Sequence, residues 1–495
     1  MKINLHYVRL LLLLLLSRSG GYVYSQPVMP LPVHSRKDSL QQDLNLVKNK
    51  LQQDYPSLYR YTAKPRITAL FDSCYATLQE TTSDLAFFGM LKFLVSQVKD
   101  GHLSCSPSRG LRQYLREQQV YFPFRLRFIN NKVYSYNGGN NGLPPGTEIL
   151  AINNVPINQV KHQLYQYIVS DGYIETKKNH ILDNFFYIYY FLAFGKQPHF
   201  NITYKAANGV IGTLRVEPVR ESALPPIEED YPNNKLLNLT ITPDHFGVLT
   251  IQTFVKTTLE EAGLDFEDFL DSAFTLLRQG FGGRSQINKL VIDLRGNGGG
   301  RDLYGSLLYS YISKGKFSYY KSLTAATNQL PYDQFKRGET SFNDLNPNLL
   351  TKTTAGTYQL QPAAHNNLQQ RSPAANNYTG EVWFLINGLS FSTTAEFCAV
   401  ARSYQRGRFI GEETGGGYEG NTSGVQIDLT LPATQLTVSF GTIQYNLAVM
   451  PVTPIGRGII PDYPVQPTIQ DLINKRDTQL ERALELVRGG KKNSS

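Results

Sequence analysis

EVWFLINGLSFSTTAEFCAVARSY, residues 381–404, places two apolar segments on either side of a short turn. VWFLI predicts a buried strand, and the segment after the turn predicts a helix over 392–404. A serine in the first turn of such a helix lies at the carboxyl edge of the sheet, where N–H groups of the helix start can bind an oxyanion. Ser392 and Thr393 fit this position, whereas Ser390 lies earlier, in the turn. The alternative is that these three residues only cap the helix.

The surrounding segments extend this unit into a sheet with helices. FGVLTIQTF and NKLVIDL predict strands, and LDFEDFLDSAFTLLRQGF and LYGSLLYSYI predict amphipathic helices, all between residues 246 and 312. Strands that alternate with helices indicate βαβ units and a largely parallel sheet. An insertion at 315–380, rich in Tyr, Asn, Gln and Thr, predicts loops that cap or cover the site at the edge of this sheet.

A second glycine-rich loop follows a buried strand at 291–302, VIDLRGNGGGRD. Its glycines let backbone amides approach a ligand closely. The loop lacks the lysine of G-x-x-x-x-G-K-[ST] and the spacing of G-x-G-x-x-G, so it does not predict a nucleotide site. We expect it to supply a second oxyanion donor.

The N-terminal part of the chain is expected to be helical over 35–98. SDLAFFGMLKFLVSQV, 83–98, repeats apolar residues at helical intervals, with Ser83 or Asp84 as its N-cap and Gly101 as its C-cap. HLSCSP then predicts a strand, which places His102 at a helix-to-strand corner. A hydroxyl nucleophile needs a base, and His102 is the best placed of eight histidines. The alternative for His102 is a purely structural role.

Residues 120–215 change to short alternating runs, such as VYFPFRLRFI and EILAIN, separated by Pro-Gly and Asn-Asn turns. These runs predict a small β-rich module. The segment PPGTEILAINNVPINQV, 144–160, is similar in part to a PDZ domain.

The first 25 residues predict a secretory signal peptide, because Lys2 and Arg9 precede the unbroken leucine run 10–16 and Val23-Tyr24-Ser25 forms a plausible cleavage site before Gln26. Seven leucines are too few to span a bilayer, which needs roughly 20 apolar residues. An uncleaved signal anchor is the alternative. No later segment is long enough to span, and the three cysteines, Cys74, Cys105 and Cys398, are too few for a disulfide framework. We expect no disulfide.

Composition excludes other classes of protein. With 41% hydrophobic and 18% charged residues, the chain has material for a globular core and is not disordered. The net charge of +9 comes from scattered residues, so we expect no nucleic-acid partner. There is no H-E-x-x-H motif or clear Cys/His cluster, and we expect no metal and no cofactor.

Three segments, VKDGHLSC, LVIDLRGNGGG and INGLSFSTTAEF, together resemble the tail-specific, or C-terminal processing, serine peptidase family. They occur in the order found in that family, and HFGVLTIQTF, FIGEETGG and GRGIIPDYPV add to the similarity. The resemblance covers about 240–470. It implies an α/β multidomain fold with a crotonase-like ββα peptidase core, Ser392 as the nucleophile, and the amides of Thr393 and of Gly299 or Gly298 as the oxyanion hole.

One departure from the family changes the expected base. Many members use a Ser-Lys dyad, with the lysine in a glycine-rich element that here reads GEETGGGYEG, 411–420, and has Gly417 at the position of the lysine. No lysine occurs between Lys352 and Lys475. The sequence is therefore similar to the family's lysine-free, tricorn-like branch, which implies His102 as the base. Glu413, Glu419 and Asp100 are the candidates for the residue that orients it.

These interpretations define the expected domains and function. We expect a signal peptide at 1–25, a helical region at 26–115, a β-rich PDZ-like module at 116–220, a peptidase core at 235–470, and a C-terminal helix with a basic tail at 471–495. The expected protein is an exported serine peptidase of a bacterial envelope, periplasmic or secreted, which acts on protein or peptide substrates. The alternatives are a catalytically silent peptide-binding protein of this fold and a hydrolase of other esters or amides.

Overall fold

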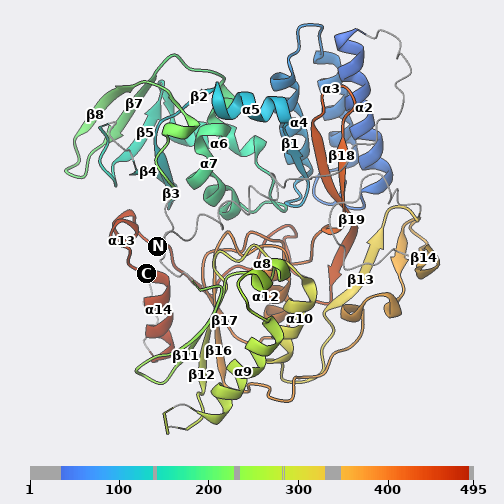
Figure 1. Cartoon of the computed structure of the whole chain (residues 1–495), viewed down its shortest axis with the longest axis vertical. Helices are drawn as coiled ribbons and strands as arrows, with labels where there is room; N and C mark the ends of the chain where they lie inside the picture. The colour runs from blue at the N-terminus through green and yellow to red at the C-terminus, as the bar shows by residue number, and fades with distance from the viewer. Residues whose placement is uncertain are drawn as a thin grey trace.

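The computed structural model describes residues 35–137, 142–227, 235–280, 282–283, 285–328 and 347–489, and Figure 1 shows three regions in it: N-terminal helices, a small antiparallel sheet and a larger C-terminal core. The predicted signal peptide, 1–25, and residues 490–495 of the basic tail lie outside the described residues. In the described part, no helix combines the length and the apolar character needed to cross a bilayer.

The central sheet of the C-terminal core has the strand order β10-β11-β12-β16-β17-β20. Only β10 is antiparallel to its neighbour, and the other pairings are parallel. This confirms the expected α/β class and the largely parallel sheet. The bounds of its strands and helices are β10 (Leu237–Ile241), β11 (Gly247–Ile251), α8 (Lys256–Glu261), α9 (Phe266–Gln279), β12 (Lys289–Asp293), α10 (Asp302–Ser310), β16 (Glu381–Ile386), α12 (Thr393–Ser403), β17 (Arg408–Gly411), β20 (Tyr463–Pro464), α13 (Ile469–Ile473) and α14 (Thr478–Val487).

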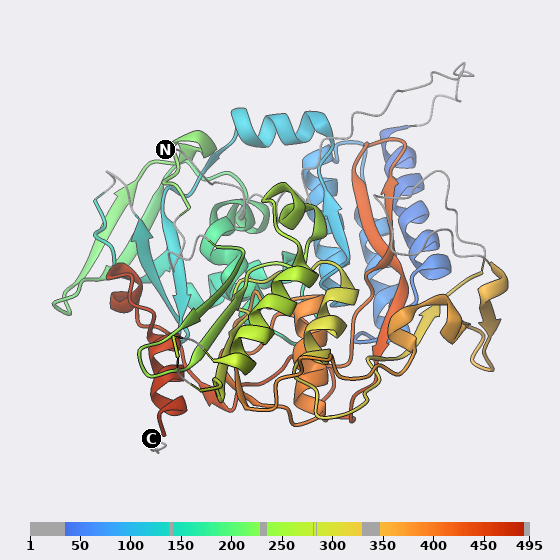
Figure 2. The same cartoon turned by 60° about the horizontal axis from the view of Figure 1, so that its bottom comes forward.

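Both faces of this sheet are covered, as a parallel sheet requires. Successive strand residues point to opposite faces: Leu290 and Ile292 pack with α9, whereas Val291 packs with α14. Figure 2 shows α9 and α14 on different sides of the sheet. Helix α12 is buried at every residue from Thr393 to Ala401, which fixes the position of the turn before it.

A second sheet joins the core to the N-terminal helices. The long strand β19 pairs with β18, β1 and β13, and the hairpin β18–β19 packs against α2 and α4 in one core cluster (Figure 1). The insertion at 315–380 contributes three of its strands, but 329–346 lie outside the described residues, and its role over the site stays a prediction. The bounds are α2 (Arg36–Asp54), α3 (Lys64–Thr77), α4 (Asp84–Val98), β1 (Ser104–Ser106), α5 (Arg109–Glu117), β13 (Tyr320–Ala325), η3 (Pro347–Leu349), β14 (Leu350–Lys352), β15 (Tyr358–Leu360), η4 (Pro362–Ala364), η5 (Asn366–Leu368), β18 (Gly424–Thr430) and β19 (Thr437–Leu447).

The ends of α4 correct one detail of the sequence prediction. Ser83 is the N-cap and accepts a hydrogen bond from the Ala86 N–H, as predicted. The C-cap is Lys99, which has the left-handed conformation, with φ 63°, so the prediction of Gly101 as the cap is wrong. Gly101 is required for a different reason. A Cβ there would lie 2.8 Å from a ring carbon of Phe391.

The β-rich module contains an antiparallel sheet with the path β3-β4-β5-β7-β8, as expected. It also contains α7, a 19-residue helix that the alternating pattern did not predict. Tyr187 and Phe191 of α7 pack into the N-terminal core, and Leu182, Phe186 and Tyr190 pack into the core of the module. Because two cores flank α7, apolar residues occur all round it, which obscures the helical period. The bounds are β2 (Val120–Tyr121), β3 (Arg125–Ile129), β4 (Lys132–Asn137), β5 (Glu148–Ile152), β6 (Val155–Pro156), α6 (Ile157–Leu164), η1 (Tyr165–Tyr167), α7 (Thr176–Phe194), β7 (Phe200–Lys205), β8 (Ile211–Val216), β9 (Val219–Arg220) and η2 (Glu221–Ala223).

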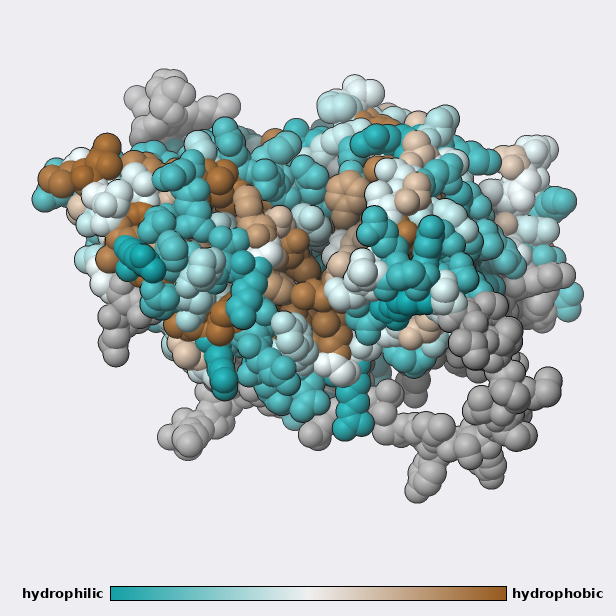
Figure 3. All heavy atoms as spheres, turned by 90° about the horizontal axis from the view of Figure 1, so that it is seen from above, coloured by the Kyte–Doolittle hydropathy of each residue, from teal (hydrophilic) through white to brown (hydrophobic). Residues whose placement is uncertain are grey.

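The surface agrees with the globular composition. Figure 3 shows hydrophobic residues mixed with hydrophilic ones on the face seen from above. Such mixing is ordinary for a folded protein. The three cysteines are free, and Cys398 is fully buried in α12, where burial raises the pKa of its thiol.

Candidate active site

Ser392 lies in a sharp turn between β16 and α12. Its backbone has φ 56° and ψ −128°, a region that non-glycine residues rarely occupy. Such strain is concentrated at functional sites, where the surrounding structure maintains it. The Ser392 side chain makes no capping hydrogen bond to α12, so the capping alternative is not observed for this residue.

The neighbouring hydroxyl groups have structural partners. Ser390 is fully buried, and its Oγ donates to the Leu294 carbonyl at 2.9 Å and accepts from the Asn387 N–H at 3.1 Å. Thr393 Oγ1 donates to the Gly300 carbonyl at 2.9 Å. Of the three hydroxyls, only that of Ser392 is directed at an ionisable side chain.

His102 is the partner of Ser392. Its Nε2 lies 3.0 Å from Ser392 Oγ, and its ring stacks on Phe391 with the centroids 4.4 Å apart. Burial is the main cause that lowers the pKa of His102, to about 4, and the positive charge of Lys177 also lowers it, while Asp171 opposes the shift. The imidazole is therefore neutral at pH 7, the state in which it can accept a proton.

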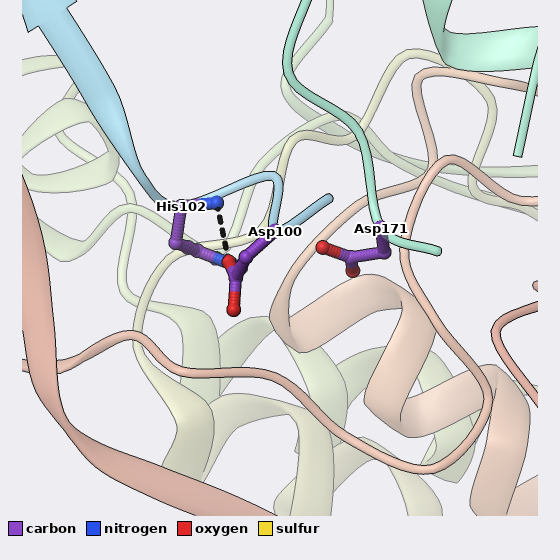
Figure 4. A group of neighbouring side chains, drawn as sticks. All are labelled: Asp100, His102 and Asp171. Carbon is purple, nitrogen blue, oxygen red and sulfur yellow. Dashed lines mark hydrogen bonds and ion pairs between the residues drawn. The ribbon is translucent and has the colours of Figure 1, made fainter. Parts of the chain in front are cut away.

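Asp100 lies on the far side of the imidazole. Its Oδ1 accepts the His102 backbone N–H at 2.8 Å and lies 3.8 Å from His102 Nδ1 (Figure 4). Nδ1 itself is buried and has no hydrogen-bond partner among the described residues. Burial, and secondly the negative charge of Asp171, raise the pKa of Asp100 to about 6. Of the three predicted orienting residues, Asp100 is the one beside the imidazole.

The two glutamates predicted as orienting residues have other partners. Both Glu413 oxygens bind the Arg457 guanidinium, at 2.8 and 2.7 Å. Glu419 Oε2 lies 3.7 Å from Arg60. Within the described ranges, neither carboxylate makes a hydrogen bond or ion pair with His102. The glycine-rich loop 411–420 directs both side chains to arginines.

Asp171 is a site residue that the sequence analysis missed. Its Oδ1 accepts the Gly101 N–H at 2.6 Å, and its Oδ2 accepts the Gly417 N–H at 2.9 Å. One carboxylate therefore joins the His102 corner to the glycine-rich loop 411–420. A single aspartate in the loop before α7 gives no local signal of this role.

The glycine-rich loop after β12 packs directly against the nucleophile turn. Gly299 has φ 97°, and a Cβ there would lie 2.7 Å from Ser392 Cβ. Gly300 has φ 145°, and a Cβ there would overlap the Phe254 backbone at 2.1 Å. Only glycine satisfies both the conformation and the approach at these two positions.

The backbone donors near Ser392 differ in availability. The Gly299 N–H, one predicted oxyanion donor, already donates to Asn297 Oδ1 at 2.9 Å. The N–H groups of Thr393 and Gly298 donate to no other group in the part of the chain that the structure describes. The structure therefore favours Thr393 and Gly298 over Gly299 as the free donors. Thr393 also begins α12, where the helix dipole favours negative charge.

A metal ion does not fit this cluster well. Asp100, His102 and Asp171 do offer potential ligand atoms within 4.8 Å of one another. However, both Asp171 oxygens and Asp100 Oδ1 already accept backbone hydrogen bonds, and the guanidinium of Arg60 interacts with both carboxylates. We therefore assign these groups to hydrogen bonding and proton transfer.

Comparison with known proteins agrees with this geometry. Residues 245–465 match the model of peptidase family S41. The chain carries a peptidase family S41 domain. It is a serine-type peptidase, and enzymes of this class act on proteins or peptides. No curated protein matches the sequence.

One solved structure supports the fold, and two others are reported beside it. Mature CPAF superposes with a TM-score of 0.61 at 14% identity, over 92% of this chain and 99% of that chain. A putative peptidase from Parabacteroides merdae gives 0.46 at 15% identity, over 91% and 96% of the two chains. The photosystem II D1 C-terminal processing protease gives 0.39 at 13% identity, over 89% and 97%. The predicted peptidase resemblance is confirmed at the level of the S41 domain, whereas the lysine-free branch and the PDZ-like segment stay predictions.

Proposed function

We propose that the protein is an exported serine endopeptidase or carboxyl-terminal processing peptidase that hydrolyses peptide bonds through an acyl-enzyme on Ser392. The observation that carries the proposal is the 3.0 Å contact between Ser392 Oγ and His102 Nε2, made at a residue with strained backbone. A nucleophile and a base within hydrogen-bond reach, with a carboxylate beside the base, are the parts that this chemistry needs.

Acylation begins with neutral His102. Nε2 takes the proton of Ser392 Oγ as the oxygen forms a bond to the substrate carbonyl carbon. The negative charge that develops on the carbonyl oxygen is stabilised by the N–H groups of Thr393 and Gly298. His102 then gives its proton to the leaving amine, the C–N bond breaks, and the acyl group remains on Ser392.

Deacylation reverses these roles. His102 takes a proton from water as the water oxygen attacks the acyl carbon, and returns it to Ser392 Oγ as the ester bond breaks. In both halves the imidazole becomes positively charged, so a nearby carboxylate stabilises the transition state. Asp100 supplies that charge. A shift of about 1 Å would bring its Oδ1 to hydrogen-bond distance of Nδ1, and catalytic hydrogen bonds often tighten in this way when the substrate binds.

Location and substrate binding complete the proposal. The charged start and leucine run of residues 1–25 support export to a bacterial periplasm or beyond it. The β-rich module is proposed to bind peptides in the manner of a PDZ domain, on the basis of its partial sequence similarity. The absence of a family lysine at Gly417 supports the tricorn-like branch, with histidine as the base.

The experiment is hydrolysis of casein and of a peptide library by the chain from Gln26, with fluorophosphonate labelling in parallel. Ser392→Ala should lose both labelling and hydrolysis, and His102→Gln should lose hydrolysis by at least 100-fold. Ser390→Ala is the matched control, because it removes a neighbouring serine that the structure does not direct at His102.

Each alternative has its own outcome. A folded wild-type protein that neither cleaves nor is labelled would favour a silent peptide-binding protein. Turnover of esters without turnover of peptides would favour the other hydrolase class. Activity lost in Ser392→Ala but kept in His102→Gln would overturn the assignment of the base.

A further inference from the structure

Lys177, in the first turn of α7, is a buried cation beside the site that the proposed chemistry does not use. Its side chain is almost fully buried, with 4% exposure. Its one hydrogen bond among the described residues is to the Gly101 carbonyl, at 3.4 Å, although an ammonium group has three donors. The charges of Asp171 and Asp100 act on it in the opposite sense to burial, and no ion pair with either is formed within the described ranges. A lysine is rarely buried in this way, so its position needs an explanation.

The Lys177 ammonium contacts the residues that hold the catalytic pair. Nζ lies 3.2 Å from the ring centroid of Phe391, the residue before Ser392, and His102 stacks on the same ring. It also contacts the residue before His102, since a Cβ at Gly101 would lie 2.7 Å from Nζ. One ammonium thus contacts the neighbours of both Ser392 and His102.

The side chain of Lys177 also packs against the loop that carries the lysine in many S41 relatives. A Cβ on Gly415 would lie 3.2 Å from Lys177 Cβ. In that loop Gly417 takes the place of the lysine, and its N–H bonds to Asp171. A positive charge therefore reaches this part of the site from α7, a different region of the chain.

His102 is surrounded by several charged or titratable groups, and Lys177 is the cation that lowers its pKa. Asp171 and Lys177 act on the imidazole through their charges, and Asp100 lies beside it. The two aspartates in turn interact with Tyr55, Arg60 and Tyr61, and Glu419 interacts with Arg60 and Tyr61. Burial lowers the pKa of Lys177 to about 8, so the group is mostly charged at pH 7.

We propose that Lys177 is a positioning residue of the active site, which holds Phe391 and the Gly101 carbonyl in place and whose positive charge adds to burial in opposing protonation of His102. This inference rests on the proposed function of the Ser392–His102 pair. A cation near an aromatic face and a carbonyl stabilises both without an exposed salt bridge. The same charge opposes protonation of His102 and favours ionisation of Asp100.

The experiment compares Lys177→Met and Lys177→Arg with wild type, and uses Lys178→Met as the matched control. Lys178 is the next residue of α7, and its Nζ donates to the Tyr165 carbonyl at 3.1 Å and lies 5.3 Å from the Tyr165 ring. The control therefore loses a similar set of contacts away from Ser392. Thermal unfolding checks that each variant is folded.

The readout is the pH at which kcat/KM falls on the acid side. This limb is assigned to Asp100, whose charge interacts with that of Lys177. Loss of the Lys177 charge should move the limb to higher pH by about one unit, because a cation several ångströms away lowers the pKa of a carboxyl by about that amount. At a pH below the limb, the activity of Lys177→Met relative to wild type should therefore be about tenfold lower than the same ratio at pH 8. Lys177→Arg should keep the wild-type limb, and so should Lys178→Met.

A second readout does not depend on turnover. Histidine-selective NMR, with the His102 signal assigned by its loss in His102→Gln, gives the pKa of the imidazole directly. In Lys177→Met it should rise by about one unit relative to wild type and Lys178→Met. If the protein proves inactive, this shift still tests Lys177, so failure of the proposed function is distinguishable from failure of the inference.

An unchanged His102 pKa and an unchanged acid limb in a folded Lys177→Met protein would overturn the inference. A uniform loss of activity at every pH, with the His102 pKa unmoved, would overturn the claim that the Lys177 charge acts on His102, since that pattern indicates only a packing role.

Discussion

Ser392 Oγ lies 3.0 Å from His102 Nε2, although 290 residues separate the two in the chain. His102 follows an N-terminal helix, and Ser392 begins a helix of the C-terminal core. The pairing β1–β19 and the stack of His102 on Phe391 bring the two regions together. The proposed site therefore exists only when the N-terminal region is docked on the core.

Gly299→Ala should inactivate the protein. The added Cβ would meet Ser392 Cβ at 2.7 Å, so the nucleophile turn must move. We expect hydrolysis to fall at least 100-fold, with a stability loss of about 1–2 kcal/mol from the left-handed conformation. Kinetics on a peptide substrate and urea unfolding measure the two effects separately.

The matched control for Gly299 is Gly209→Ala. Gly209 has a similar positive φ, 86°, but a Cβ there meets nothing within 4 Å. It should lose a similar amount of stability and keep full activity. Equal activity in the two variants would show that the contact with Ser392 is unimportant.

Asp100→Asn tests whether Asp100, and not Glu413, is the carboxylate that orients His102. Asp100 is 3.8 Å from His102 Nδ1, whereas Glu413 binds Arg457. We expect kcat to fall roughly 100- to 10,000-fold in Asp100→Asn, the range seen when an orienting aspartate is neutralised. Glu413→Gln in the same assay should keep kcat within a few-fold of wild type. A larger loss of kcat in Glu413→Gln than in Asp100→Asn would favour Glu413 as the orienting residue.

Local sequence patterns predicted the elements that carry the site. The strand β16, the helix α12 and the β12 strand with its glycine loop each have a continuous signal of apolar spacing followed by a turn, so they could be located from the sequence. The pairing of Ser392 with His102 was predicted from the resemblance to a peptidase family, which rests on three motifs that occur in the family's order. Each motif is confined to a few neighbouring residues.

The rest of the site depends on contacts between distant segments, which no local pattern encodes. Asp171 joins Gly101 to Gly417, and Lys177 reaches Phe391 from α7. Helix α7 itself was missed because its two sides face two different cores. Glu413 was chosen for its closeness in sequence, but Arg457, 44 residues later, binds its carboxylate.

The pH dependence of kcat/KM should follow Asp100. The pKa of Asp100 is raised to about 6 by burial and Asp171, and that of His102 is lowered to about 4. Below pH 6 the protonated Asp100 no longer carries the charge that stabilises the imidazolium, so kcat/KM should fall about tenfold per pH unit there. A pH–rate profile with one peptide checks this. In Asp100→Asn the limb near pH 6 should disappear, and its persistence would contradict the assignment.

Glu396→Gln should change how stability depends on pH. Glu396 is in α12, one turn after Ser392, and both its oxygens are buried, Oε1 accepting from Asn421 at 2.6 Å and Oε2 from Tyr320 at 2.9 Å. Burial, and secondly Asp302, raise the pKa of Glu396 to about 8 from 4.5. The folded state therefore favours the protonated carboxyl. Below about pH 4.5 this group is protonated in both states, and between about 4.5 and 8 the folded protein holds a proton that the unfolded chain releases.

The sign of the effect follows from this proton. As pH rises from about 4.5 to 8, the Glu396 carboxyl should lower the free energy of unfolding by about 1 kcal/mol per pH unit, and no further above 8. Glu396→Gln removes this contribution, so the variant should gain stability relative to wild type as pH rises from 5 to 8 in urea unfolding. The control is Glu381→Gln, at an exposed residue. Its free energy of unfolding, plotted against pH, should run parallel to that of wild type. If the Glu396→Gln curve is also parallel to that of wild type, the carboxyl is ionised in the folded protein, and α12 then carries a buried negative charge one turn after the nucleophile.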